Sequence, residues 1–472
     1  MSLSTVHPTS VTKNPQSSRT YSSYTDIARY LDAAWNVPLD PSGARMAQLD
    51  TALGNPSKKV SPLFVAGTNG KELFCHFTTR LLVEEKYTVG TLTGPHIQKY
   101  TERISCNGTH LTDAQFTELF SEVIARAHDK KITAHAQELI TAAALYYFVQ
   151  TGVNATILEL SKPYEYDPAT ICTPKIVALM RVTAENVEVT HRATPESIAP
   201  LMSLVKPKTA VICADPSKLN LSIVQAAVIA AGGQWLMPIR KAAPLAYPFE
   251  QLHGRYAALA ERVVHTYITQ TEGATHKDPT SLLTKPRAHR GRPTLEAKKQ
   301  AELNPEKTIE QFWRTVHTNV PGQFQLLNTE HPAIVLDTAS NIESLKQLLL
   351  GVRLIHYRTP LKGLSIVMGF DGNDYNTTEL VKTIRYFFKK TMGQLFLCPV
   401  EAVPGVTVSP EKCVLQLQQL TTECTSAKIK VRLCSSFADA LQNAQESVDE
   451  RHGLVVITGS GAVVHNYWQL KK

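Results

Sequence analysis

The stretch Leu-Phe-Val-Ala-Gly-Thr-Asn-Gly-Lys at residues 63–71 decides how this chain is organised. A short apolar run stops at Gly67, and Lys71 follows a second glycine. Glycines let backbone N–H groups approach an anion, and a helix that follows directs the positive end of its dipole to the same place. Phe74 and Phe77 continue the chain at helical spacing. The stretch therefore predicts a phosphate-binding loop between a buried strand and a helix, with Lys71 as the cation for the outer phosphates.

The residues directly after the lysine do not follow the usual pattern of such a loop. A phosphate loop normally offers Ser or Thr at this point to hold Mg²⁺, whereas Glu72 and Leu73 follow here. Glu72 adds negative charge where phosphates would bind, and it would repel a nucleotide unless Mg²⁺ or Lys71 compensates. An ordinary turn lysine is the alternative interpretation of Lys71, but the strand–loop–helix setting favours phosphate binding.

Composition indicates a globular protein of more than one domain. With 472 residues the chain is too long for one ordinary core, and its 43% hydrophobic and 19% charged content is typical of globular proteins. No apolar run approaches the roughly 18 residues that a membrane span needs, so we expect no membrane partner. The eight cysteines are scattered without a C-x-x-C pair, which argues against zinc and disulfides and favours a reducing, cytoplasmic setting.

The net charge of +8 raises the question of a nucleic-acid partner. Residues 276–307 hold eight Lys and Arg against four Asp and Glu, so half of the excess lies in one segment without periodicity. Such a segment is more often a solvated insert than a nucleic-acid surface, so we do not expect nucleic acid as a partner. The first 24 residues are rich in Ser, Thr and Pro and lack the apolar block of a secretory signal, which favours a disordered polar leader over a transit peptide.

Strand and helix patterns alternate along the chain, which predicts an α/β fold with a mainly parallel sheet and right-handed crossovers. We expect a disordered leader over residues 1–24, a central domain with the phosphate loop over 25–269, a basic flexible insert over 270–308, and a smaller C-terminal, Rossmann-like α/β domain over 309–472. The expected strands beyond the loop strand are 88–92, 156–160, 176–180, 210–213, 333–336, 364–368, 394–397, 429–433 and 454–457, and the clearest helices are 112–127, 136–150 and 252–268.

Several motifs in order along the chain resemble the Mur ligase superfamily and, within it, the folylpolyglutamate synthase / dihydrofolate synthase branch. Residues 65–71 resemble the family's phosphate loop, and 93–96 with 102–108 resemble its T-S-P-H…N-E-R-I…N-G stretch. Further similar stretches are Glu138 with Thr141 (F-E-x-L-T), Leu158-Glu159 (L-E-V), Pro321-Gly322 (P-G-R), Asp337-Thr338-Ala339-Ser340-Asn341 (D-G-A-H-N) and Thr458-Gly459-Ser460 (the closing G-S). The resemblance implies that both domains are Mur-ligase-like.

The resemblance also implies a reaction and a set of site residues. ATP would lie between the two domains and phosphorylate a folate carboxylate, and the amine of glutamate would then form the amide, a step of one-carbon metabolism. Carried over by motif, Lys71 and Glu159 would be catalytic, and Glu159 and Glu185 would hold Mg²⁺. The other residues implied are Gly67, Thr68, Asn69, Gly70, Lys71, Asp337 and Asn341 for the nucleotide, and Pro95, His96 and Arg103 for the substrate side.

Departures from the family pattern leave two hypotheses open. The serine that ligates Mg²⁺ in the family is Leu73 here, the histidine of D-G-A-H-N is Ser340, and the arginine of P-G-R is Gln323. The glycine-rich segment after Glu159 is replaced by 161–167, in which we expect Tyr164 and Tyr166 to be surface or packing residues. The family's metal-binding histidine falls on Glu185, its carbamylated lysine on Leu201 and its asparagine near adenine on Ala260.

The first hypothesis is a divergent ligase that acts as a monomer in the cytoplasm on folate and glutamate. The alternative is a catalytically degraded paralogue, a pseudoenzyme that binds a nucleotide, another ligand or a protein. Glu159 could also cap a helix or pair with a lysine instead of holding metal, while His96 and Arg103 are expected to shape the substrate loop more than to take part in chemistry.

Overall fold

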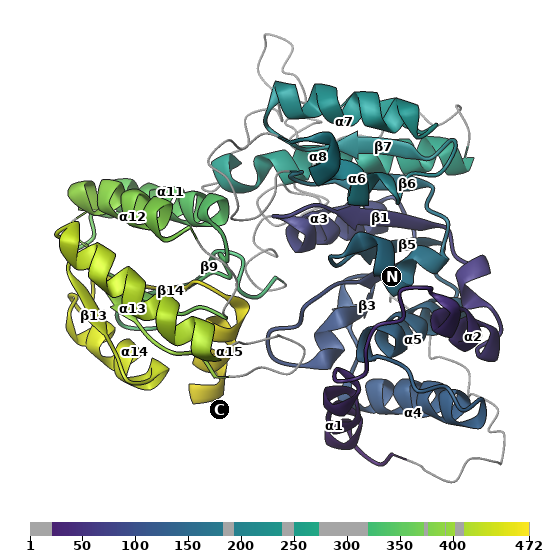
Figure 1. Ribbon diagram of the computed structural model, residues 1–472, viewed down its shortest axis with the longest axis horizontal. Helices are drawn as coiled ribbons and strands as arrows, with labels where there is room; N and C mark the ends of the chain where they lie inside the picture. Colours follow the sequence, from purple (N-terminus) through teal and green to yellow (C-terminus); the bar gives the residue numbers. More distant parts are fainter. Residues whose placement is uncertain are drawn as a thin grey trace, which may run out of the picture.

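The computed structural model describes residues 21–182, 193–237, 250–272, 320–371, 376–391, 393–401 and 410–471. These residues form two lobes, each built on a sheet covered by helices (Figure 1). Glu185 and most of the predicted basic insert, from residue 273 onward, lie outside the described residues. Helix α1 begins at Tyr24, within the predicted leader, and the hydroxyl of Ser23 accepts a hydrogen bond from the Asp26 amide to cap it.

The first sheet is mainly parallel, as predicted, and β1 lies near its centre between β5 and β6. Strands β2, β3 and β4 continue one edge, where β3 pairs antiparallel to both of its neighbours. The strands in spatial order are β4 (Thr109–His110), β3 (Ile104–Cys106), β2 (Val89–Leu92), β5 (Ala155–Glu159), β1 (Pro62–Ala66), β6 (Ile176–Leu179), β7 (Ala210–Cys213) and β8 (Gln234–Leu236).

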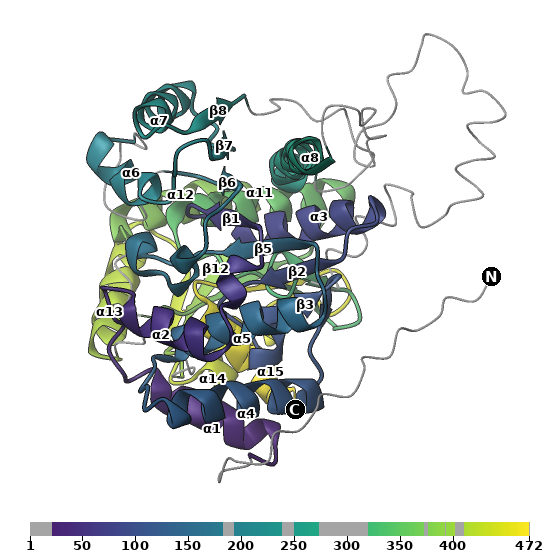
Figure 2. The same ribbon diagram turned by 90° about the vertical axis from the view of Figure 1, so that its right-hand side faces the viewer.

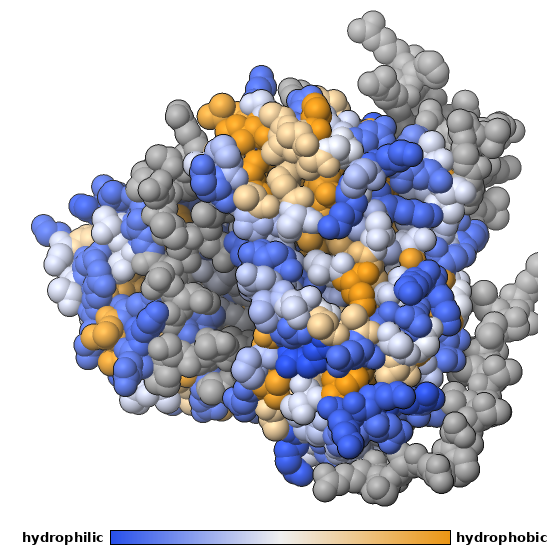
Figure 3. Space-filling view, turned by 45° about the vertical axis from the view of Figure 1, so that its right-hand side comes forward, coloured by the Kyte–Doolittle hydropathy of each residue, from blue (hydrophilic) through white to orange (hydrophobic). Residues whose placement is uncertain are grey.

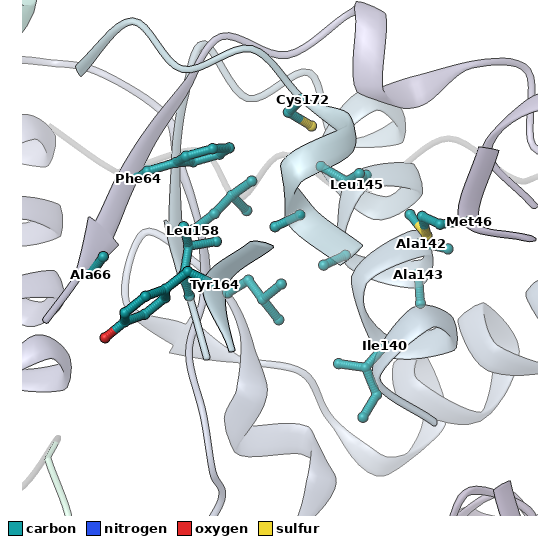
Figure 4. Packing of buried hydrophobic residues seen from close by; sticks show 14 of the residues in the cluster. Met46, Phe64, Ala66, Ile140, Ala142, Ala143, Leu145, Leu158, Tyr164 and Cys172 are labelled. Atoms are coloured by element: carbon teal, nitrogen blue, oxygen red, sulfur yellow. The ribbon is translucent and has the colours of Figure 1, made fainter. Parts of the chain in front are cut away.

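Every residue of β1 is buried, because both faces of the sheet are covered. Successive side chains of a strand point to opposite faces, so Phe64 and Ala66 join one core cluster and Leu63 and Val65 the other. Figure 4 shows part of the first cluster, where Phe64 and Leu158 face Leu145. The second cluster is closed by α3 and α8, which lie side by side in Figure 2.

The helices that the sequence predicted in the first lobe are present in the structure. The predicted helix 112–127 is α4, which runs two residues past its predicted end, and the predicted helix 252–268 is α8, which extends beyond both predicted ends. Helix α7 and the strands β3, β4 and β8 were not predicted. The helices are α1 (Tyr24–Ala34), α2 (Ala44–Ala52), α3 (Lys71–Glu84), α4 (Asp113–Asp129), α5 (Ala136–Gln150), α6 (Pro195–Met202), α7 (Lys218–Ala230) and α8 (Glu250–Glu272), with short 3₁₀ turns η1 (Pro56–Lys58), η2 (Tyr100–Arg103), η3 (Tyr164–Tyr166) and η4 (Pro168–Ile171).

The second sheet is parallel except for its edge strand β9, which pairs antiparallel to β10 and was not predicted. Its strands in spatial order are β13 (Val431–Leu433), β12 (Gly393–Leu397), β11 (Leu364–Met368), β14 (Leu454–Thr458), β10 (Ala333–Leu336) and β9 (Gln325–Leu327). Its helices are α11 (Ile342–Arg358), α12 (Thr377–Thr391), α13 (Pro410–Ser426), α14 (Phe437–Glu446) and α15 (Gly461–Leu470).

The surface in Figure 3 is mostly hydrophilic, with an apolar area at the top, where α7 lies. Leu219 and Ile229 of this helix are among the exposed large hydrophobic residues. In the part of the chain that the structure describes, no helix has the length and apolar character needed to cross a membrane.

The two lobes are joined by a loop of the first that enters the core of the second. Ile97, which follows β2, is only 6% exposed and packs in the cluster formed by Leu336, Val464 and Tyr467. A ring nitrogen of His465 on α15 lies within hydrogen-bond distance of the Ile97 carbonyl oxygen. An ion pair between Arg181 and Glu343 crosses the same boundary, with 2.6 Å between nitrogen and oxygen.

Replacing Ile97 by alanine should therefore loosen the attachment of the two lobes. Removing a buried isoleucine side chain leaves a cavity, and we expect a loss of about 2–4 kcal/mol in the free energy of unfolding, measured by urea denaturation. The matched Ile97→Val variant should lose only about 0.5–1.5 kcal/mol. Equal stability of Ile97→Ala and wild type would contradict this role of the side chain.

Candidate functional site

The predicted phosphate loop is a strand–loop–helix unit, because β1 ends at Ala66 and α3 begins at Lys71. Gly67 and Gly70 both have positive φ angles, +110° and +82°. A β-carbon on Gly67 would lie 2.8 Å from the carbonyl oxygen of Arg181, and one on Gly70 would lie 2.2 Å from the ring of Tyr256. The tight turn thus needs glycine at both positions, and it places the first turn of α3, where backbone amides lack helical partners, toward the cleft.

Tyr164 anchors this loop, a role that the sequence did not predict. Its hydroxyl accepts a hydrogen bond from the Gly67 amide at 3.0 Å and donates one to the Gly67 carbonyl oxygen at 2.9 Å. Figure 4 shows the ring beside Leu158, with the hydroxyl directed away from the apolar cluster. Tyr164 is buried, as expected for a packing residue, whereas Tyr166 is 44% exposed. Tyr164 therefore holds the backbone of the loop in place.

A cavity of about 290 Å³ lies at the loop, where the carboxyl ends of the parallel strands of both sheets meet. In open α/β sheets, ligands bind at the carboxyl ends of parallel strands. The first lobe lines the cavity with Thr68, Asn69, Gly70, Lys71, Glu72, Leu73, Gly94, Pro95, Ile97, Glu159 and Tyr256, and the second with Gln323, Phe324, Asp337, Thr338, Ala339, Ser340, Ser344, Gln347, Leu348, Asp371 and Gly461.

Lys71 and Glu159 face each other in this cavity. The ammonium nitrogen of Lys71 lies 3.5 Å from Oε1 of Glu159, which stands at the end of β5. Burial raises the pKa of Glu159, and the charge of Lys71 opposes that rise. The second carboxylate oxygen, Oε2, is buried and has no hydrogen-bond partner. The lysine pairing is one of the alternatives foreseen for Glu159, and it leaves one oxygen available to a ligand.

Glu72 points into the same cavity and contacts the second lobe. The side-chain amide of Gln323 donates hydrogen bonds to Glu72 Oε2 and to the hydroxyl of Thr338, both at 3.3 Å. Burial raises the pKa of Glu72 to about 8, and the neighbouring Glu159 carboxylate adds to the rise. Gln323 stands where the resemblance places an arginine, so a neutral donor meets Glu72 here.

Several of the residues expected to bind a nucleotide form hydrogen bonds with other groups of the protein. Asn69 and Asn341 exchange side-chain amide hydrogen bonds across the cleft, at 3.2 and 2.7 Å. Asp337 accepts a hydrogen bond from the Phe324 amide at 2.9 Å, and burial raises its pKa to about 7. Thr68 donates its amide to the carbonyl oxygen of Arg181. These polar groups line or border the cavity and are held in defined positions.

On the expected substrate side, Pro95 lines the cavity, while His96 and Arg103 lie behind it. Arg103 donates a hydrogen bond from Nε to Nδ1 of His96 at 2.9 Å. Burial and the charge of Arg103 lower the pKa of His96 to about 2, so the ring is neutral and can accept that bond. The guanidinium also stacks over the rings of Trp35 and Tyr100. This arrangement fits a role in shaping the loop.

Two carboxylates among the described residues have the donor atoms that a divalent cation binds. Glu159 offers an unpartnered buried oxygen, which suits a hard cation, and Glu72 lies in the same cavity. Leu73 is 2% exposed and packs in the core cluster of α3 and α8, so it offers no ligand. No group of three or more His, Cys, Asp or Glu side chains in the described ranges is arranged to hold a metal. The donors therefore fit a cation that also takes oxygens from a ligand or water.

Comparison with known proteins relates the whole architecture to one branch of enzymes. No family model matches the chain. The dihydrofolate synthase/folylpolyglutamate synthase of Bacillus subtilis is 26% identical over 340 residues, which cover 70% of this chain and 76% of that protein. The alignment to the enzyme of the same name from Buchnera aphidicola is 30% identical but spans only 40% of that protein.

Solved structures of this branch share the fold. The Mycobacterium tuberculosis folylpolyglutamate synthase complexed with ADP has a TM-score of 0.71 at 16% identity, covering 95% of this chain and 98% of that one. The bifunctional enzyme of Yersinia pestis complexed with AMPPNP and a Mn ion has a TM-score of 0.68 at 18% identity, covering 97% and 100%. The predicted fold class, a large mainly parallel sheet with a smaller α/β lobe, is thereby confirmed as that of these ligases.

Replacing Tyr164 by phenylalanine tests the anchoring of the loop. The variant loses both hydrogen bonds to Gly67 and leaves a buried amide unpaired, so we expect a loss of about 1–3 kcal/mol in the free energy of unfolding. Urea denaturation measures it, with Tyr166→Phe as the matched control, expected within about 0.5 kcal/mol of wild type. Equal losses in the two variants would show that the hydroxyl of Tyr164 does not hold the loop.

The raised pKa of Glu72 predicts a pH dependence of stability in metal-free buffer. Its ordinary value of 4.5 rises to about 8 on folding, so the native state binds the proton more tightly than the unfolded state. Wild-type stability should therefore fall, relative to Glu72→Gln, as the pH rises from about 4.5 to about 8. Urea denaturation across this range gives the difference, and Glu84→Gln at the far end of α3 serves as control. A difference that does not change with pH would contradict the burial of this carboxyl.

Proposed function

We propose that this chain, a divergent relative of the folylpolyglutamate synthase / dihydrofolate synthase branch of the Mur ligase superfamily, is an ATP-dependent amide ligase that joins glutamate to a folate carboxylate. The observation that carries the proposal is the cavity at which the phosphate loop and the strand ends of the second sheet meet. Relatives hold ADP, or AMPPNP with manganese. We assign ATP and Mg²⁺ to this cavity.

The proposed chemistry runs in two steps. A folate carboxylate takes the terminal phosphoryl group of ATP to give an acyl phosphate and ADP, and the amine of glutamate then displaces phosphate to form the amide. Both steps need negative charge on phosphate oxygens to be neutralised and the reactants to be held in line. A divalent cation supplies part of that neutralisation when bound.

We propose the following roles for the residues of the chain. Lys71 neutralises the outer phosphates, and Glu159, 3.5 Å away, fixes the direction of its ammonium group. The loop of Gly67, Thr68, Asn69 and Gly70 forms the phosphate cradle, in which the amides of Gly67 and Thr68 hold the turn through Tyr164 and Arg181. Asp337 and Asn341 bind the nucleotide from the second lobe, and Pro95, His96 and Arg103 shape the folate side. Glu185, a predicted metal ligand outside the described residues, stays a prediction.

The proposal extends to the organisation and setting of the protein. We propose a central ATP-binding domain over residues 25–269 and a C-terminal domain over 309–472, joined by the basic insert. All eight cysteines are free thiols, which supports the proposed reducing, cytoplasmic setting. We propose a monomer, because the cavity draws on both lobes of a single chain.

The alternative, a pseudoenzyme that keeps the scaffold, is favoured by one set of observations. Leu73, Ser340 and Gln323 replace groups that the family uses, and the Asn69–Asn341 pair bridges the cleft directly. Such a protein would bind a nucleotide or another ligand without ligation. Nucleotide binding without product formation would favour this alternative over the ligase.

Calorimetric titration of Mg-ATP into wild type and Lys71→Ala tests the nucleotide site. Loss of a charge-assisted contact to phosphate costs about 1.5–3 kcal/mol, so we expect affinity to fall roughly 10- to 100-fold in the variant. Lys130→Ala, at an exposed position that follows the end of α4 and does not line the cavity, should bind as wild type does. The absence of any binding heat with wild type, at more than one temperature, would overturn the proposal.

A further inference from the structure

We infer that Glu72 and Glu159 together form the protein's half of a divalent-cation site at the first turn of α3, with Glu72 providing the oxygen that Leu73 does not. The inference rests on the proposed function, because the remaining ligands would be water and phosphate oxygens. Mg²⁺ and Mn²⁺ are the cations this donor set suits, since Mg²⁺ is commonly held by one or two carboxylates together with substrate phosphates.

The placement of the two carboxylates supports the inference. Glu159 is the last residue of β5. Glu72 is the second residue of α3, the helix that follows the loop after β1, and β1 is the strand next to β5. Both side chains line the same cavity, and the Glu159 carboxylate disfavours the ionised state of Glu72. Two carboxylates that share a cavity therefore need a cation between them or must give up charge.

The cations already present leave room for another. Lys71 contacts Oε1 of Glu159 at 3.5 Å, a long ion pair, and the charge of Arg103 acts on Glu159 from behind the cavity. Glu72 receives a neutral amide from Gln323 at 3.3 Å. Lys71 and Arg103 both favour the ionised form of Glu159, and Lys71 also favours that of Glu72, which accepts a hydrogen bond from the uncharged Gln323.

The second oxygen of Glu159 points independently to a ligand. Oε2 is buried, the side chain is 4% exposed, and no hydrogen-bond donor reaches this atom. Burying an unpaired carboxylate oxygen is costly, and a hard cation is the partner that such an oxygen binds best. Glu72 is half-buried, whereas Glu159 is buried. A cation held by Glu159 could therefore take Glu72 as its outer carboxylate.

Manganese binding to the full chain tests the inference directly. Mn²⁺ alone is titrated and its free aquo signal followed by electron paramagnetic resonance, with wild type, Glu72→Gln, Glu159→Gln and the control Glu84→Gln. Even outer-shell partners of a metal typically change affinity 10- to 100-fold, so we expect each of the first two variants to weaken Mn²⁺ binding at least about tenfold. The control should bind as wild type does, and unchanged circular dichroism establishes that each variant is folded.

A second arm separates this inference from the proposed function. The affinity for AMPPNP is measured by calorimetry with and without Mn²⁺, and the gain from Mn²⁺ should be at least about tenfold smaller in Glu72→Gln than in wild type. AMPPNP binding whose dependence on Mn²⁺ is the same in Glu72→Gln and wild type would overturn the inference and keep the function. Mn²⁺ binding that is lost in Glu72→Gln while wild type binds no AMPPNP would support the cation site and defeat the function. Failure of wild type to bind Mn²⁺, both alone and together with AMPPNP, would overturn the inference.

Discussion

The tight course of the backbone between Gly67 and Lys71 is the constraint on which the site depends. Side chains at Gly67 and Gly70 would collide with the Arg181 carbonyl and the Tyr256 ring, so the turn exists only with glycine at both places. Tyr164 fixes the same turn through both backbone groups of Gly67. Because the turn is fixed, α3 starts at Lys71 and brings its ammonium group to Glu159 on the neighbouring strand.

The cleft between the lobes is bridged partly by groups that the resemblance assigns to the nucleotide, Asn69 and Asn341, and partly by groups that it does not. Asn69 pairs with Asn341, Glu72 accepts from Gln323, and Ile97 fills part of the second core. Under the proposed function, a nucleotide entering the cavity exchanges the asparagine pair for contacts of its own. Such an exchange costs little, because one set of hydrogen bonds replaces another. The bridging contacts thus hold the lobes in the arrangement that forms the cavity without excluding a ligand.

Much of this arrangement could be predicted from local patterns in the sequence. Buried apolar runs, helical spacing and the two loop glycines predicted the strand–loop–helix unit, and the same patterns placed Glu159 and Asp337 at strand ends. That both lie at one site between the domains was implied by the family resemblance. The contacts of Tyr164 and Gln323 could not be predicted, because each joins residues far apart in the chain, with Gln323 and Glu72 separated by 251 positions. The missed strands β3, β4, β8 and β9 have two or three residues each, too few for a period to show.

The central claim is that the cavity carries out ligation. Its most direct measurement is the formation of ADP, with mass-spectrometric detection of the glutamylated folate, by the full chain supplied with Mg-ATP, a reduced folate and glutamate. The account predicts ADP and product in equal amounts, dependent on all three substrates and abolished in Lys71→Ala. ADP formed without the folate product, or no turnover by a wild type that binds Mg-ATP, would contradict it.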